Sequence, residues 1–127
     1  MKVLSISWLG VKTAQFDRTR EFFSQVMGLT ISYQNTDFAV LELPDGDKLE
    51  LFGPAGPDPE PQFSNNTVVA GFSVEDFEKA REELVHGGAE LVGEPGGDPG
   101  GYRWQHFRAP DGKIFEVSSE PLRRRPD

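Results

Sequence analysis

The sequence contains one motif twice, as Leu43-Pro44-Asp45-Gly46-Asp47-Lys48-Leu49-Glu50-Leu51 and as Ala109-Pro110-Asp111-Gly112-Lys113-Ile114-Phe115-Glu116-Val117. In both copies Pro presets the backbone of a tight turn and Gly supplies the positive φ that the turn needs. A Glu follows the Asp of each turn by five residues and lies between apolar neighbours. Because side chains alternate along a strand, both Glu side chains are expected on the face opposite those neighbours. The repeat therefore predicts a duplicated hairpin with one carboxylate in each copy.

The hydrophobic pattern around each hairpin predicts a strand, a helix and three further strands. In the first half the strands are predicted over 2–12, 29–34, 37–43 and 48–53, and the helix over 15–27. In the second half they are predicted over 67–73, 89–93, 102–108 and 113–118, and the helix over 75–87. We interpret the glycine-rich residues 93–101 as a long hairpin connection.

The predicted fold class is therefore α+β, with two tandem βαβββ modules. We place the modules at 1–53 and 67–118, a Pro/Gly-rich linker at 54–66, and a frayed tail at 119–127. The full length of 127 residues fits one compact domain.

Composition excludes several classes of function. A net charge of −8 argues against nucleic-acid binding, which needs clustered Lys and Arg. The chain has no Cys, which excludes disulfides, Cys zinc sites and thiol nucleophiles. It has only two His, which nearly excludes a site that needs two or three imidazole groups. No stretch approaches the roughly 18 apolar residues of a membrane span, so we expect a cytoplasmic protein.

The ordered motifs resemble the vicinal-oxygen-chelate superfamily of glyoxalase I, extradiol dioxygenases, fosfomycin-resistance enzymes and bleomycin-resistance proteins. The resemblance implies that the two modules form an open-barrel cup, and that two chains pair as a homodimer. It also implies a divalent metal held by one residue on the first strand and one on the last strand of each module. The segments that carry the resemblance are Gly10-Val11, Phe22 to Leu29, Lys48 to Pro54, Gly71 to Asp76, and Phe107 to Val117.

Only two of the four implied metal-ligand positions hold a residue that can bind a metal. The last-strand positions match Glu50 and Glu116, but the first-strand positions match Trp8 and Val69, which cannot ligate a divalent cation. We therefore predict no metal cofactor; if any metal were bound, Glu50 and Glu116 would be its ligands.

Strand alternation predicts which side chains line the cup beside the two carboxylates. Aromatic rings next to an imidazole and carboxylates suit a small planar or cationic organic ligand. The predicted ligand-binding residues are Trp8, Phe38, Val40, Glu50, Tyr102, Trp104, His106, Arg108 and Glu116.

Two interpretations stay open for the central residues. Glu50 and Glu116 are either ordinary polar residues of a wet cavity or a cation site, and Trp8 is either a core residue or a ligand contact. His106 is either a structural, hydrogen-bonded imidazole or a catalytic base paired with Glu116.

The favoured function is metal-independent binding of a small molecule, similar to the ligand-sequestering bleomycin-resistance proteins. The alternative is a lyase or isomerase that uses His106, Glu50 and Glu116, with or without a divalent metal. A third reading is a non-catalytic module that binds a protein partner.

Overall fold

The protein is described by a computed structural model that covers residues 1–55, 63 and 66–119. The first module holds β1 (Val3–Lys12), α1 (Phe16–Glu21), a π-helical segment η1 (Phe22–Val26), β2 (Thr30–Gln34), β3 (Phe38–Glu42) and β4 (Lys48–Phe52). The second holds β5 (Val68–Val74), α2 (Phe77–His86), β6 (Glu90–Gly97), β7 (Arg103–Arg108) and β8 (Ile114–Ser119). The order βαβββ occurs twice, which confirms the predicted fold class.

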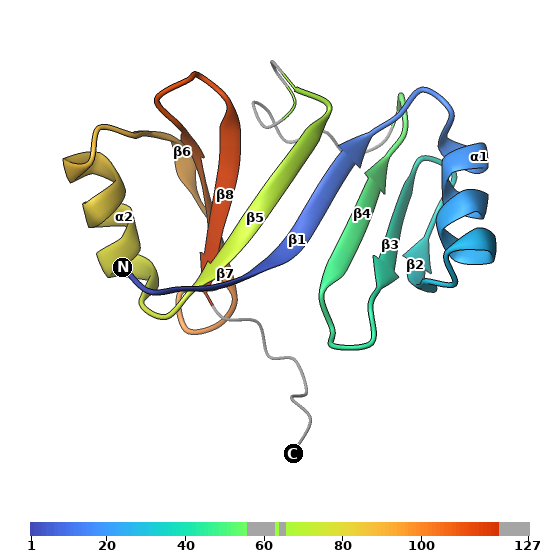
Figure 1. Ribbon diagram of the computed structural model, residues 1–127, viewed down its shortest axis with the longest axis horizontal. Coiled ribbons are helices and arrows are strands. Elements are labelled where there is room, and N and C mark those ends of the chain that lie inside the picture. The colour runs from blue at the N-terminus through green and yellow to red at the C-terminus, as the bar shows by residue number, and fades with distance from the viewer. Residues whose placement is uncertain (56–62, 64–65, 120–127) are drawn as a thin grey trace.

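The eight strands form one open sheet in the order β2-β3-β4-β1-β5-β8-β7-β6 (Figure 1). Within each module the first strand pairs in parallel with the last, β1 with β4 and β5 with β8. The modules join where β1 and β5 pair antiparallel at the centre of the sheet. None of the described helices is long and apolar enough to cross a membrane.

Both helices pack on one face of the sheet, which we call the helix face. Leu9 and Val11 of β1 pack against the core cluster that contains Phe16 of α1, and Val117 of β8 packs against Phe77 of α2. Residues that alternate with these point to the opposite face, which we call the open face. Glu116 on the open face is only 5% exposed although no helix covers it, so the sheet must curve around its own side chains there.

Three local predictions were wrong. Strand β6 continues to Gly97, through residues that we assigned to a loop, because Gly96 pairs with Trp104 after a bulge. The predicted helix over 15–27 is α-helical only to Glu21 and then widens into η1, where Met27 N–H donates to the Phe22 carbonyl. Ser119, assigned to the tail, is the last residue of β8; residues 120–127 and most of the linker lie outside the described residues.

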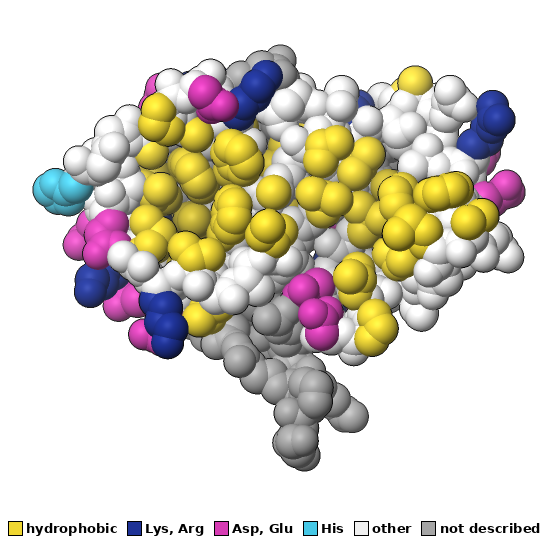
Figure 2. All heavy atoms as spheres, in the orientation of Figure 1, with side chains coloured by type: hydrophobic (Ala, Val, Ile, Leu, Met, Phe, Trp, Pro, Cys, Tyr) yellow, Lys and Arg dark blue, Asp and Glu magenta, His cyan; other side chains and the backbone are white. Residues whose placement is uncertain are grey.

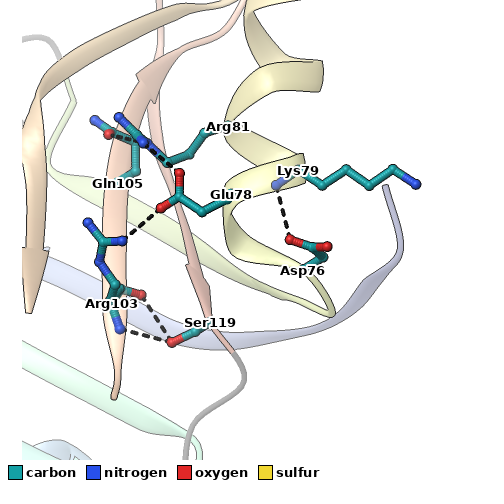
Figure 3. A network of polar contacts seen from close by, with 7 residues as sticks. All are labelled: Asp76, Glu78, Lys79, Arg81, Arg103, Gln105 and Ser119. Atoms are coloured by element: carbon teal, nitrogen blue, oxygen red, sulfur yellow. Dashed lines mark hydrogen bonds and ion pairs between the residues drawn. The ribbon is translucent and has the colours of Figure 1, made fainter. Parts of the chain in front are cut away.

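A polar network holds α2 against β7 (Figure 3). Glu78 accepts from Arg103 at 2.7 Å and from Arg81 at 3.0 Å, and both guanidinium groups lie over the Phe77 ring. Arg81 also donates to the side-chain oxygen of the fully buried Gln105 at 3.1 Å. The network thus connects the helix to the interior of the second module.

The Gln105 amide nitrogen replaces the missing strand pairing at the β6 bulge. It lies 3.1 Å from the Val92 carbonyl oxygen and 3.0 Å from those of Gly93 and His106. Because buried carbonyl groups need donors, this side chain stabilises the irregular edge of the sheet.

We predict that Gln105→Leu lowers the free energy of unfolding by about 2 kcal/mol, because it leaves buried acceptors without a donor. Urea denaturation followed by circular dichroism measures the change. The exposed Gln34→Leu is the matched control and should change the stability by less than about 0.5 kcal/mol. Equal stabilities of the two variants would contradict the assigned role of Gln105.

Candidate functional site

The two repeated carboxylates lie on either side of the central strand pair. Glu50 on β4 pairs with Gly10 on β1, and Glu116 on β8 pairs with Gly71 on β5. Since β1 and β5 are neighbours, the two Glu side chains approach the same patch of the open face from opposite sides. The charge of Glu116 acts on Glu50, which agrees with this proximity.

Trp8 lies between the two carboxylates. Its indole N–H donates to Glu50, and it pairs across β1 and β5 with Gly71. A Cβ built on Gly71 would stand 3.2 Å from the Trp8 Cβ and 3.5 Å from Glu116 Oε1. Glycine at this position therefore lets Trp8 and Glu116 approach each other closely.

Glu116 is paired with His106. His106 Nε2 lies 3.4 Å from Glu116 Oε2, and the two residues are 9% and 5% exposed. Burial raises the pKa of Glu116, and the hydrogen bond and charge of His106 offset part of that rise. The pair has the composition of a general acid–base site, with the carboxylate orienting the imidazole.

Glu50 has weaker compensation for its burial. Burial raises the pKa of Glu50, the Trp8 N–H opposes the rise, the Glu116 charge adds to it, and the Lys48 charge, the smallest of the four effects, lowers it. An ionised carboxylate offers about four lone-pair sites, and a neutral indole donor satisfies one of them. The site therefore favours an incoming proton or cation near Glu50.

Tyr102 and Trp104 extend the site along the second module. Their ring centroids lie 5.9 Å apart with planes tilted by 40°. Burial raises the pKa of Tyr102 to about 12; its interaction with the Ser118 hydroxyl lowers the pKa, and the charges of Glu116 and Glu50 raise it. The phenol is therefore neutral at physiological pH and can donate a hydrogen bond.

The other predicted residues are Val40, Phe38 and Arg108, and only Val40 is a direct neighbour of a site carboxylate. Val40 pairs directly with Glu50. Phe38 packs on Phe52 with ring centroids 5.1 Å apart, in an aromatic cluster. Arg108 donates to the Gly112 carbonyl at 3.1 Å and lies 3.8 Å from Glu90, at the end of the β7–β8 hairpin. The structure thus brings Trp8, Glu50, Tyr102, His106 and Glu116 together and engages Phe38 and Arg108 in other contacts.

Sequence reasoning missed Gly10 and Gly71. Each is the direct strand partner of a repeated Glu, and each provides space for Trp8. Their equivalent positions in the two modules were the available signal. That signal was hard to use because a glycine within a strand has several explanations.

The residues do not fit the divalent metal that the fold resemblance implies. The ring of Trp8 fills the space over Gly10, and its N–H occupies one side of the Glu50 carboxylate. Val69, at the equivalent position of the second module, offers only alkyl groups. Within residues 1–55, 63 and 66–119, no three His, Asp or Glu side chains are placed to hold a metal ion together.

Comparison with known proteins agrees with this architecture. The sequence pattern of the Glyoxalase/Bleomycin resistance protein/Dioxygenase superfamily matches residues 5–117. No curated protein compared with the chain matches it significantly.

Solved structures share the fold at low sequence identity. The Mn(II)-bound glyoxalase from Novosphingobium aromaticivorans has a TM-score of 0.75 and 21% identity, over 99% of this chain and 43% of that one. Methylmalonyl-CoA epimerase from Streptomyces coelicolor has a TM-score of 0.68 and 19% identity, over 98% and 100%. A superfamily member from Vibrio splendidus 12B01 has a TM-score of 0.63 and 20% identity, over 88% and 96%. At these identities the likeness shows the fold alone.

The raised pKa values of Glu50 and Glu116 predict a pH-dependent stability. A folded state with raised carboxyl pKa values binds protons more tightly than the unfolded chain, so the stabilisation is complete below the ordinary pKa of 4.5 and falls as pH rises through the raised values. We expect the unfolding free energy of the native chain, relative to that of Glu50→Gln/Glu116→Gln, to decrease steadily above pH 4.5.

Denaturant titrations from pH 4.5 to pH 7.5 measure this difference. The exposed Glu82→Gln is the control, and its difference from the native chain should stay nearly constant. A double variant that loses stability relative to the native chain as pH rises would show that the two carboxyl groups are stabilised in their charged form.

Proposed function

Because the chain belongs to the Glyoxalase/Bleomycin resistance protein/Dioxygenase superfamily, we propose that it binds and sequesters a small organic cation without a metal, in the manner of a bleomycin-resistance protein. The observation that carries the proposal is the pair of carboxylates on either side of Trp8. Glu116 has a partner in His106, whereas Glu50 receives the neutral indole donor.

A cation is the ligand that this arrangement favours. Two carboxyl groups that burial makes harder to ionise are stabilised by an added positive charge. A bare divalent metal would need further oxygen or nitrogen ligands, and the positions of Trp8 and Val69 supply none. An organic ammonium needs only acceptors and an apolar surround, which the carboxylates and aromatic rings provide.

We predict that the chelator-stripped protein shows no one-to-one binding of Zn, Mn, Ni or Fe(II) at submillimolar metal. Isothermal titration should instead detect saturable binding of benzylammonium, with benzyl alcohol as the neutral compound of similar shape. Glu50→Gln/Glu116→Gln should weaken benzylammonium binding at least tenfold, and Glu82→Gln should leave it unchanged. Tight metal binding that Glu116→Ala abolishes would overturn the proposal and favour a metal enzyme.

The second candidate function is acid–base catalysis by His106 and Glu116. The contact of 3.4 Å between Nε2 and Oε2, in a buried setting, favours it. His106 would move a proton of a bound substrate, and Glu116 would hold the imidazole in one orientation. A lyase or isomerase of this kind requires turnover that disappears in His106→Ala.

We also propose that two chains associate through the uncovered centre of the helix face. Side chains there form an apolar band from α2 across β8, β5 and β1 towards α1 (Figure 2). Strand pairing places six residues of β1 and β5 in the band: Ile6, Leu9, Val11, Val68, Ala70 and Phe72. None of the six is charged, so a second acidic chain meets no repulsion from them, and contiguous apolar surface of this kind marks interfaces.

Sedimentation velocity tests this association. We expect a dimer for the native chain and a monomer for Val68→Lys, since Val68 is 50% exposed within the band and a buried lysine would be unpaired. Tyr33→Lys is the matched control, because Tyr33 is 54% exposed on β2, outside the band. A native chain that sediments as a monomer at tens of micromolar would contradict the proposal.

A further inference from the structure

Both tryptophans of the chain lie flat against a glycine of the sheet. A Cβ built on Gly10 would stand 2.7 Å from Cζ2 and 3.0 Å from Cζ3 of Trp8. A Cβ built on Gly96 would stand 2.5 Å from Cζ2 and 2.6 Å from Nε1 of Trp104. Real Cβ atoms do not approach other atoms this closely, so each ring occupies space that only glycine leaves free.

The packing of the indole against Gly10 determines which part of Trp8 can contact a ligand. The indole packs over Gly10, and a Cβ built on Gly71 would stand 3.2 Å from Cε3 of its six-membered ring. The ring edge carries the N–H that is bound to Glu50. Trp8 is only half-buried, so part of its indole stays accessible from the open face.

The indole lies beside both carboxylates. Its N–H donates to Glu50, and a Cβ built on Gly71 would stand 3.2 Å from the Trp8 Cβ and 3.5 Å from Glu116 Oε1. The face of an aromatic ring is itself negative in character and attracts cations, most strongly in tryptophan. A flat ring therefore supplies stacking area and electrostatic attraction at one place.

We infer that Trp8, seated on Gly10 and Gly71, is a stacking platform, and that the ligand is a planar aromatic cation whose ring lies on the indole while its charge meets Glu50 and Glu116. This inference rests on the proposed function and narrows its ligand class. A compact ammonium ion would contact the carboxylates without stacking on the indole. A neutral aromatic ring would stack on the indole without bringing a positive charge to the carboxylates. Gly10 is the positioning residue, because a side chain at position 10 would displace the indole.

The test uses Trp8 as its own reporter. The chain has two tryptophans, so Trp104→Phe leaves Trp8 as the single emitter. The probe is N-methylquinolinium, a planar cation, with quinoline at neutral pH as the uncharged ring and cyclohexylammonium as the cation that is not flat. We expect saturable quenching of Trp8 by N-methylquinolinium, and at least tenfold weaker binding of the other two compounds measured by titration calorimetry.

Glycine variants distinguish the contribution of stacking on Trp8 from the contribution of the charged carboxylates. Gly10→Ala should weaken N-methylquinolinium binding at least tenfold and reduce its preference over cyclohexylammonium. Gly100→Ala is the matched control, since a Cβ at Gly100 meets no atom within 4 Å, and it should bind as the native chain does. Trp8→Leu in the native background, measured by calorimetry, gives the same answer if Gly10→Ala fails to fold.

The outcomes distinguish the inference from the function on which it rests. Equal binding of N-methylquinolinium and cyclohexylammonium, or no effect of Gly10→Ala and Trp8→Leu, overturns the platform while cation binding stands. Failure of every organic cation to bind the native chain overturns both. Loss of planar preference in Gly10→Ala and Trp8→Leu, together with retained preference in Gly100→Ala, supports the platform.

Discussion

Antiparallel pairing of β1 with β5 is the interaction on which the whole site depends. Each module alone would place its Glu beside the glycine of its own first strand, Glu50 beside Gly10 and Glu116 beside Gly71. Only the β1–β5 pairing puts Trp8 opposite Gly71, with Gly10 opposite Val69 two residues away. A slip of one residue in this register would turn Trp8 to the helix face and leave the carboxylates apart.

The site is electrostatically costly, and the rest of the fold must compensate for it. Buried carboxylates are tolerated when they are paired and hydrogen-bonded. Glu116 is paired with His106, whereas the hydrogen-bond donor to Glu50 is the neutral indole of Trp8. The second module, which carries His106, is stabilised in turn by the buried Gln105 and its link to α2 through Arg81. A polar site that destabilises its own scaffold is typical of a functional position.

The sequence predicted what depends on local pattern. The repeated Pro-Asp-Gly turn and strand alternation were enough to identify two βαβββ modules and to place Glu50 and Glu116 on the face away from the helices. The pattern failed where a side chain replaces backbone pairing. Strand β6 runs to Gly97 through Pro95 and Gly96 because Gln105 binds the carbonyls of the bulge, and no local propensity records that long-range contact.

The orientation of the Trp8 ring could not be predicted from the sequence, for a related reason. Alternation predicts that its side chain leaves the correct face of β1, but not whether the ring stands upright or lies flat. That choice depends on Gly10 along the same strand and on Gly71 across the sheet. The register that joins them appears only when both modules are assembled.

The difference between this chain and a metal-binding relative of the same fold is therefore not one substitution. The resemblance implies a metal ligand at the position of Trp8, and an indole at that position would collide with the new Cβ if residue 10 were alanine. The ring, its two glycines and the Glu50 carboxylate form one arrangement, in which the glycines leave the space that the ring needs. Because one fold can carry different sites, the proposed change of ligand from an ion to an organic molecule requires no change of the fold.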